Sequence, residues 1–478
     1  MIFITLSLIA LAIRLPHLSE RPMHTDEAVN AYITGQLLAG EKYHYDPQDR
    51  HGPVLYLLAK PVAQLCGAKN LGELTETELR LTPVFVGSAT ILLFGAAVEM
   101  FGFIPCLIAA LLFAVGPLPV YYSRYFIHET MFVAATFALM LCGWRAAANS
   151  STSLAALTGL SAALMLACKE TAVIHFFALG LGAAICPWAT KSKKYFIKAK
   201  LILTALGSFF VTTILLFTWF GQNWSALADL LRAIPNFAAR AGGQGHEKSF
   251  LYYFTVLDPL FVFIIVATAG IFAVVCDAFA GKRRAGLLLT IYSLAIFLIY
   301  SAIPYKTPWL ALNFWLPLTL LCGLGAEGIS LQFHNSAGRW VAGIGIAALV
   351  LVAGQQTQTL AFDYPADEKN PLAYAHTTED ILGLPARLAE ICRQRNLSQP
   401  RIEVVAKDAW PLPWFLRKFS NVGYWQPGQE AGAADFFITP TDLDGRLATK
   451  LKDFRPEFFG VRPNVLLILW IPPALKKP

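Results

Sequence analysis

The sequence predicts an all-α polytopic membrane domain followed by a small C-terminal α/β soluble domain. Of its 478 residues 56% are hydrophobic and only 14% are charged, whereas about a quarter of a soluble chain is charged. Apolar stretches near the length that a bilayer requires recur up to about residue 355. From about Gln356 charges and prolines return and the apolar segments shrink to strand length. We therefore expect a transmembrane domain over 1–355 and an extracytoplasmic domain over 356–478.

The apolar stretches predict about eleven transmembrane helices. They lie near 1–16, 81–99, 103–121, 130–145, 153–168, 171–189, 201–220, 258–277, 285–303, 308–331 and 340–355. The first has no basic n-region and no small-x-small cleavage site, so we interpret it as a retained span and not as a signal peptide.

Basic residues in the connecting loops predict the orientation. The loops 191–200 and 281–284, together with Arg145 and Arg339, fall on one face, which the positive-inside rule makes cytoplasmic. The N-terminus is then cytoplasmic in a multi-pass protein of the cell membrane. The loop 17–80 and the tail from about 356 lie outside. The basic loops 191–200 and 281–284 account for the net charge of +7. The sequence has no basic face with interleaved aromatic residues, so nucleic-acid binding is not predicted.

The first outer loop is predicted to hold two interfacial helices. Apolar residues recur at helical spacing over 29–37, and the run 53–67 is too short and too interrupted by Lys60 and Pro61 to span. Between them the segment 43–53 is dense in His, Asp and Arg and includes Arg50 and His51. It is either the rim of a cavity or an ordinary solvated loop.

Three ionisable residues, His24, Asp26 and Glu27, follow the first span directly. Charge beside hydrocarbon is costly unless it is used or paired, which makes this stretch a candidate site. The alternative is that the two carboxylates only occupy the first turn of a helix capped by Thr25.

Two further outer segments carry charge. Arg124, His128 and Glu129 lie at the outer mouth of the third and fourth spans, where Glu129 is a second outer carboxylate or again an acidic helix start. Lys306, between two prolines, is either a point charge for a lipid-linked phosphate or a snorkelling lysine. Lys169 and Glu170 are interpreted as a simple turn between hairpin helices, because adjacent residues do not share a helix face.

In the tail, the segments 401–406, 435–439 and 464–470 predict strands, and 377–396 predicts a helix that starts after threonine caps. Trp410 and Trp414 either stack on sugar or anchor the domain at the membrane interface. The eight cysteines are scattered, without CxxC or Cys/His ligand spacing, so neither a disulfide framework nor a zinc site is predicted.

Several short motifs follow one another along the chain. They are RPxHxDEA at Arg21–Ala28, YDP...HGP at Tyr45–Pro53, YSR within Tyr121–Arg124, YKTPW at Tyr305–Trp309 and PLPWFLR at 411–417. With the first-loop acidic pair and the Arg124 to Glu129 corner, they resemble the GT-C glycosyltransferases that use lipid-linked sugars, such as protein mannosyltransferases and aminoarabinose transferases. More narrowly, the chain resembles the related flippase-activity-associated membrane proteins. It departs from them in having His128-Glu129 where relatives have Asn-Asp, and Arg50 and His51 where relatives often carry a lysine.

This resemblance implies an inverting transfer of a sugar from a polyprenyl-phosphate donor to an acceptor hydroxyl of a glycan, lipid or protein at the outer face. Asp26 is the candidate general base, with Glu27 beside it. Glu129 would orient the acceptor or hold a divalent cation with Asp26, although two carboxylates and a histidine are too few to define a metal site. The candidates for binding substrate are His24, Arg50, His51, Arg124, His128 and Lys306, several of which can stabilise the departing phosphate.

A second hypothesis is a lipid-glycan translocation or assembly protein that binds the carrier and makes no bond. A flippase needs charge neutralisation along a path through the spans, and few ionisable residues fall mid-span here, which favours the transferase. A third hypothesis is a membrane scaffold, which predicts that Asp26 can be replaced without effect.

Overall fold

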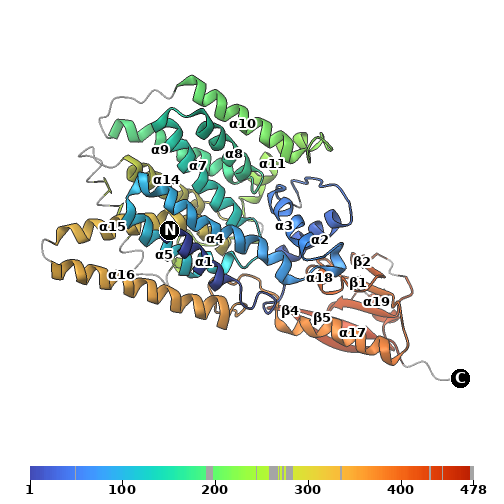
Figure 1. Ribbon diagram of the computed structural model, residues 1–478. Helices are drawn as coiled ribbons and strands as arrows, with labels where there is room; N and C mark the ends of the chain where they lie inside the picture. The colour runs from blue at the N-terminus through green and yellow to red at the C-terminus, as the bar shows by residue number, and fades with distance from the viewer. Residues whose placement is uncertain are drawn as a thin grey trace. The chain divides into compact units, whose positions relative to one another are not determined.

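The chain forms two compact units. The computed structural model describes all residues except 49, 190–197, 244, 258–266, 269, 272–273, 276–283, 334–335, 430–431, 444 and 474–478. We call Met1–Pro16, Lys42–Val62 and Arg80–Pro365 the helical unit, and His17–Glu41, Ala63–Leu79 and Ala366–Pro478 the α/β unit. Two pieces of the first predicted outer loop thus belong to the same unit as the tail (Figure 1). The boundary expected near residue 355 stays a prediction.

The helical unit is built almost entirely from helices. They are α1 Ile2–Arg14, α3 Val54–Leu65, α4 Glu76–Phe101, α5 Phe103–Val115, α6 Pro117–Tyr122, α7 Glu129–Asn149, α8 Thr152–Leu166, α9 Ala172–Ala189, α10 Ala199–Phe217, α11 Ala226–Arg240, α12 Tyr252–Leu257, α14 Arg284–Ala302, η3 Pro308–Ala311, α15 Leu312–Gln332, α16 Ser336–Thr357 and the π-helical turn η4 Gln358–Asp363.

Six of the described helices are long and apolar enough to cross a membrane. They are Glu76–Phe101, Glu129–Asn149, Ala199–Phe217, Arg284–Ala302, Pro308–Gln332 and Ser336–Asp363. Five apolar helices are shorter, among them α1, α5 and α8, so the number of about eleven spans is not confirmed. The expected span 258–277 and the basic loops 191–200 and 281–284 lie mostly outside the described residues. The chain is a membrane protein, and its orientation stays a prediction.

Glycines let the backbones of neighbouring helices approach closely. A Cβ at Gly323 of α15 would lie 2.3 Å from the carbonyl oxygen of Pro105 in α5. A Cβ at Gly159 of α8 would lie 2.0 Å from the carbonyl oxygen of Ala205 in α10. Helices in lipid lack a hydrophobic driving force for association, and small residues at such crossings allow the close van der Waals packing that stabilises the helix pair instead.

The predicted span 103–121 is wrong as one helix. Helix α5 ends at Val115, Gly116 is extended with φ −70° and ψ 147°, and α6 restarts with Pro117 in its first turn. A side chain at Gly116 would collide with Trp315, at 2.4 Å from its Cζ2. Proline at the start of a helix costs no hydrogen bond, which explains why the chain turns here.

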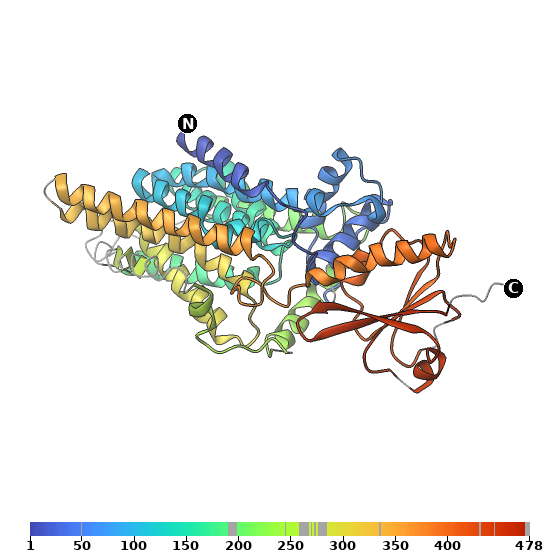
Figure 2. The same cartoon turned by 90° about the horizontal axis from the view of Figure 1, so that it is seen from below.

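The α/β unit contains one mixed sheet with helices. Its elements are α2 Thr25–Leu38, η1 Leu71–Glu73, η5 Glu379–Leu382, α17 Gly383–Gln394, β1 Ile402–Val405, α18 Leu412–Phe415, β2 Val422–Trp425, β3 Phe436–Pro440, α19 Gly445–Lys450, β4 Arg455–Arg462 and β5 Val465–Ile471. The strand order is β2-β1-β3-β5-β4. β1 runs parallel to β2 and β3, and β5 is antiparallel to β3 and β4. Figure 2 shows the strands as one sheet, with α17 running across one face.

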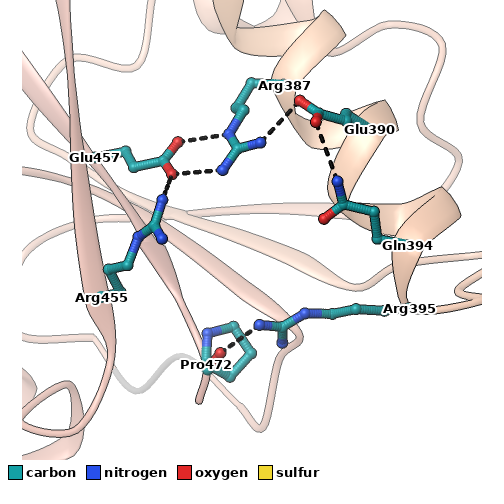
Figure 3. Close-up of polar contacts among 7 residues, drawn as sticks. All are labelled: Arg387, Glu390, Gln394, Arg395, Arg455, Glu457 and Pro472. Atoms are coloured by element: carbon teal, nitrogen blue, oxygen red, sulfur yellow. Dashed lines mark hydrogen bonds and ion pairs between the residues drawn. The ribbon is translucent and has the colours of Figure 1, made fainter. Parts of the chain in front are cut away.

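An ion-pair network ties α17 to β4 (Figure 3). Arg387 of α17 donates to both carboxylate oxygens of Glu457, at 2.8 Å from Nε and 2.7 Å from a terminal nitrogen. Its other nitrogen meets Glu390 at 2.8 Å, and Arg455 also donates to Glu457. Bidentate arginine pairs fix geometry as well as adding energy, so this network holds the helix against an edge strand.

Candidate functional site

Helix α2 begins with a cap formed by His24. Its Nδ1 accepts the backbone N–H of Asp26 at 3.0 Å, and the Glu27 carboxylate accepts the backbone N–H of His24 at 3.2 Å. The prediction of Thr25 as the cap is therefore wrong. The imidazole Nδ1 supplies the acceptor that Ser, Asn or Asp usually provides, and Glu27 completes a capping box.

The two neighbouring carboxylates have different surroundings. Glu27 is 0% exposed and also lies 3.5 Å from a terminal nitrogen of Arg21. Asp26 is partly exposed, and its carboxylate accepts no hydrogen bond from any residue that the structure describes. Because a general base must be reached by the proton it removes, Asp26 fits this role and Glu27 fits that of a structural support.

A segment of the tail supports the corner that carries Asp26. Nε2 of His24 lies 3.0 Å from the carbonyl oxygen of Tyr374, and the hydroxyl of Thr377 donates to the carbonyl oxygen of Met23 at 2.7 Å. The His24 ring also lies 5.4 Å from that of His376, centroid to centroid. Since Nδ1 accepts from Asp26, the ring proton of neutral His24 is on Nε2 and is donated to Tyr374. Burial lowers the pKa of His24.

In the helical unit, Glu129 is the first residue of α7 and forms a buried ion pair. Its Oε1 lies 2.5 Å from Nζ of Lys169, in the turn between α8 and α9, and both side chains are buried. Burial alone would lower the pKa of Lys169, but the charge and hydrogen bond of Glu129 outweigh it and raise that pKa. The carboxylate of Glu129 is thus neutralised by a cation from the adjacent hairpin.

The next residue of that turn, Glu170, organises the polar segment 43–53. Its carboxylate accepts the Tyr45 hydroxyl at 2.7 Å and lies 2.8 Å from Nδ1 of His51. Burial opposes ionisation, but His51 and Tyr45 lower the pKa of Glu170 to about 2. The His51 ring lies edge-to-face on His128, 5.3 Å away, and burial lowers the pKa of His128 well below its ordinary value. His51 is partly exposed, so its other ring nitrogen is the atom able to meet a ligand.

Two of the remaining predicted cations, Arg124 and Lys306, are engaged by backbone carbonyl oxygens. A terminal nitrogen of Arg124 donates to the carbonyl oxygens of Arg14 at 2.8 Å and Pro16 at 2.5 Å, and the guanidinium lies over the Phe362 ring. Nζ of Lys306 donates to the carbonyl oxygens of Lys248 and Ile303. Burial lowers the pKa of Lys306.

The predicted site residues are divided between the two units. His24, Asp26 and Glu27 lie in the α/β unit, and His51, His128 and Glu129 lie in the helical unit together with Arg50, Arg124 and Lys306. The sharing of one pocket by Asp26 and Glu129 stays a prediction. No group of three or more His, Cys, Asp or Glu side chains arranged for a metal ion occurs among the described residues.

Two functional candidates were missed by the sequence interpretation, Lys169 and Glu170. Their adjacency predicts a plain turn, and adjacent residues indeed do not pair with each other. Each pairs instead with a different partner, Lys169 with Glu129 and Glu170 with His51. The available signal was their position, two opposite charges at a turn between apolar segments, where unpaired charge is costly.

The roles predicted for Trp414 are wrong. Its side chain is 1% exposed, and its indole N–H donates to Glu76 at 2.8 Å, so it neither stacks on sugar nor anchors the domain at the membrane interface. The guanidinium of Arg417 covers its ring at 3.6 Å.

Comparisons with known proteins agree with this architecture. A family model described as dolichyl-phosphate-mannose-protein mannosyltransferase matches residues 50–217. The crystal structure of ArnT from Cupriavidus metallidurans bound to undecaprenyl phosphate is similar with a TM-score of 0.64 and 16% identity, covering 99% of each chain. The archaeal oligosaccharyltransferase AglB from Archaeoglobus fulgidus, in complex with an inhibitory peptide and a dolichol-phosphate, is similar with a TM-score of 0.59 and 12% identity, covering 100% of this chain and 74% of that one.

The arabinofuranosyltransferase AftD from Mycobacteria is similar with a TM-score of 0.51 and 14% identity, covering 98% of this chain and 41% of that one. No curated protein matches the sequence. At these identities the likeness concerns the fold. The resemblance to GT-C glycosyltransferases is thus confirmed at the level of fold, whereas the narrower resemblance to flippase-activity-associated proteins stays a prediction.

Proposed function

We propose that this protein is a membrane glycosyltransferase that moves a sugar from a polyprenyl-phosphate donor to an acceptor hydroxyl at the outer face of the membrane, with inversion. The observation that carries the proposal is the pair Asp26 and Glu27, in which one carboxylate is sealed as a helix cap and the other is left accessible. A membrane scaffold would need only the helix cap that Glu27 completes and not an accessible carboxylate beside it. The fold shared with ArnT and AglB supports the same conclusion.

In the proposed reaction, Asp26 takes the proton of the acceptor hydroxyl while the oxygen of that hydroxyl attacks the anomeric carbon of the donor sugar. The bond from that carbon to the phosphate oxygen breaks, and the polyprenyl phosphate leaves with the electron pair. A positioned general base contributes about 10²–10⁴-fold. His24 and Glu27 hold the backbone of Asp26 in place, so they act as positioning residues.

The departing phosphate gains negative charge, and His51 is the best-supported residue to meet it. Glu170 fixes one ring nitrogen of His51, and the side chain is partly exposed. A preoriented donor stabilises developing charge without reorganising during the reaction. Glu129, neutralised by Lys169, is proposed to orient the acceptor. Arg124 and Lys306 already satisfy backbone carbonyls, which favours structural roles for them.

The test is release of polyprenyl phosphate by the purified protein in proteoliposomes that contain a polyprenyl-phospho-sugar and candidate acceptors. We expect Asp26→Asn to reduce release by about 10²–10⁴-fold. Glu41→Gln, an exposed carboxylate just beyond the end of α2, is the matched control and keeps wild-type activity. Wild-type activity in Asp26→Asn would remove the assigned base. Carrier binding without release by the wild type would favour the translocation or assembly protein.

A further inference from the structure

Three aromatic side chains from separate elements gather on the α/β unit. Tyr32 of α2 is 39% exposed, and its ring lies 5.9 Å from that of Trp410, at 78°. Trp410 is partly exposed and follows the carboxyl end of β1. Tyr424 of β2 is 41% exposed, and partial burial and the neighbouring Tyr32 raise its pKa. We call Tyr32, Trp410 and Tyr424 the aromatic cluster.

The surrounding structure fixes the cluster from two sides. Helix α18 packs against α2 and is anchored by the buried Trp414, which holds the segment carrying Trp410. Along β2, side chains alternate between faces, so Tyr424 points away from Trp425. The indole N–H of Trp425 donates to the buried carboxylate of Glu403, which defines the opposite face. The exposed rings therefore need little ordering when a ligand binds.

A charged pair borders the cluster beside Trp410. The carboxylate of Asp408 accepts the backbone N–H of Trp410 at 3.1 Å and lies 3.0 Å from a terminal nitrogen of Arg462. The Asp408 side chain is 52% exposed. The pair offers hydrogen-bond acceptors and donors at the edge of an apolar platform and adds no net charge.

We propose that the aromatic cluster binds a pyranose unit of a glycan, with Asp408 and Arg462 contacting its hydroxyls. A sugar ring has an apolar C–H face and a rim of hydroxyls. The negatively charged face of an aromatic ring attracts such C–H groups, and tyrosine and tryptophan combine this apolar body with a polar tip. A site on an anionic membrane surface would instead carry an excess of lysine and arginine around the rings. The neutral pair at this edge favours the glycan.

One member of the cluster, Tyr32, lies on the same helix as the proposed base. Tyr32 follows Asp26 by six residues, which is roughly 9 Å along the α2 axis. The same spacing places the two side chains roughly 120° apart around the helix, so a glycan held on the rings reaches Asp26 by following the helix surface. We propose that this bound glycan is the acceptor. This assignment as an acceptor subsite rests on the proposed function, whereas the binding itself does not.

The test is saturation-transfer NMR on the full-length protein in nanodiscs, with maltotetraose, mannotetraose and chitotetraose as neutral probes. We expect the wild type to bind at least one probe, and Tyr32→Ala and Tyr424→Ala each to weaken that binding roughly three- to tenfold. Phe458→Ala is the matched control, because Phe458 is 57% exposed on β4, the opposite edge strand of the same sheet, and its loss leaves binding unchanged.

Two outcomes would overturn the proposal. One is that the wild type binds none of the probes, and the other is that the tyrosine variants bind as the wild type does. Fluorescence quenching by brominated lipids that disappears in Trp410→Phe would place the cluster in the bilayer surface and also count against it. Failure of the proposed function is seen separately, as absence of polyprenyl phosphate release by the wild type.

Discussion

At the scale of single residues, Asp26 and Glu27 show how neighbouring carboxylates acquire different roles. Helical geometry points them in different directions, so Glu27 reaches back to the His24 backbone and Arg21 while Asp26 stays partly exposed. The sequence allowed a helix start or a site, and the structure shows the helix start in full. The cap uses Glu27, which leaves Asp26 available for chemistry.

The pair of Glu129 and Lys169 leads to a prediction about stability. Lys169→Met removes the cation and leaves a buried carboxylate without its partner, which is expected to cost about 3–5 kcal/mol of unfolding free energy. The double variant Lys169→Met/Glu129→Leu removes both charges and should recover most of that loss. Thermal unfolding in detergent measures both variants. Equal destabilisation by the single and double variants would show that the unpaired Glu129 carboxylate is not the cause of the loss in Lys169→Met.

Single residues also show where sequence interpretation stops. The acidic stretch after the first apolar segment was visible because charge follows that segment so closely. The roles of Lys169 and Glu170 could not be predicted in the same way, because their partners Glu129 and His51 lie 40 and 119 positions away in the sequence. No local pattern encodes such pairings, which depend on how the α8 to α9 turn meets α7 and the segment 43–53.

At the scale of elements, most of the predicted helices and three of the five strands are found because their apolar patterns are strong. The expected helix 103–121 is divided between α5 and α6, and 258–277 lies mostly outside the described residues. β2 and β4 were missed for identifiable reasons. β2 is four residues long and includes Gly423, and β4 carries Pro456 and several charges, which are unusual within strands. Both are edge strands, where such residues are tolerated and also discourage pairing with another chain.

The close helix crossings give a second prediction. Gly323→Ala and Gly159→Ala place a Cβ against a backbone oxygen of the neighbouring helix, which must move, so each is expected to cost about 1–3 kcal/mol. Gly207→Ala, on α10, is the matched control because nothing lies within 4 Å of its Cβ. That change is expected to be neutral or slightly stabilising, since alanine favours the helix. Equal melting temperatures in all three variants would contradict this account of the crossings.

At the scale of the whole molecule, the chain passes between its two units several times. The α/β unit combines His17–Glu41 and Ala63–Leu79 with the tail, and Thr377 and Tyr374 of the tail hold the corner before α2. The proposed base is therefore supported by residues about 350 positions away. Composition predicted a separate tail domain, but composition carries no information about which earlier segments that domain would include.

The third prediction concerns the pH dependence of the folded state. Burial lowers the pKa of His24 and of His128 below their ordinary 6.5, so the folded chain binds fewer protons than the unfolded chain below that pH. Stability is then fully present above about pH 6.5 and falls as the pH drops, by up to about 1.4 kcal/mol per pH unit for each histidine. Glu170, with a pKa of about 2 against 4.5, loses its contribution only below pH 4.5. The histidines therefore control the range between pH 4.5 and 6.5.

The variant His24→Asn separates this titration from the loss of the cap. Asparagine is a good N-cap residue but does not titrate, so the cap of α2 is kept while the titration of His24 is removed and that of His128 stays. The melting temperature of this variant at pH 8 is expected to lie somewhat below that of the wild type, because the bond to Tyr374 changes. Between pH 6.5 and 5, its melting temperature should fall less steeply than that of the wild type. If both proteins lose stability with the same slope, protonation of His24 does not contribute to the loss.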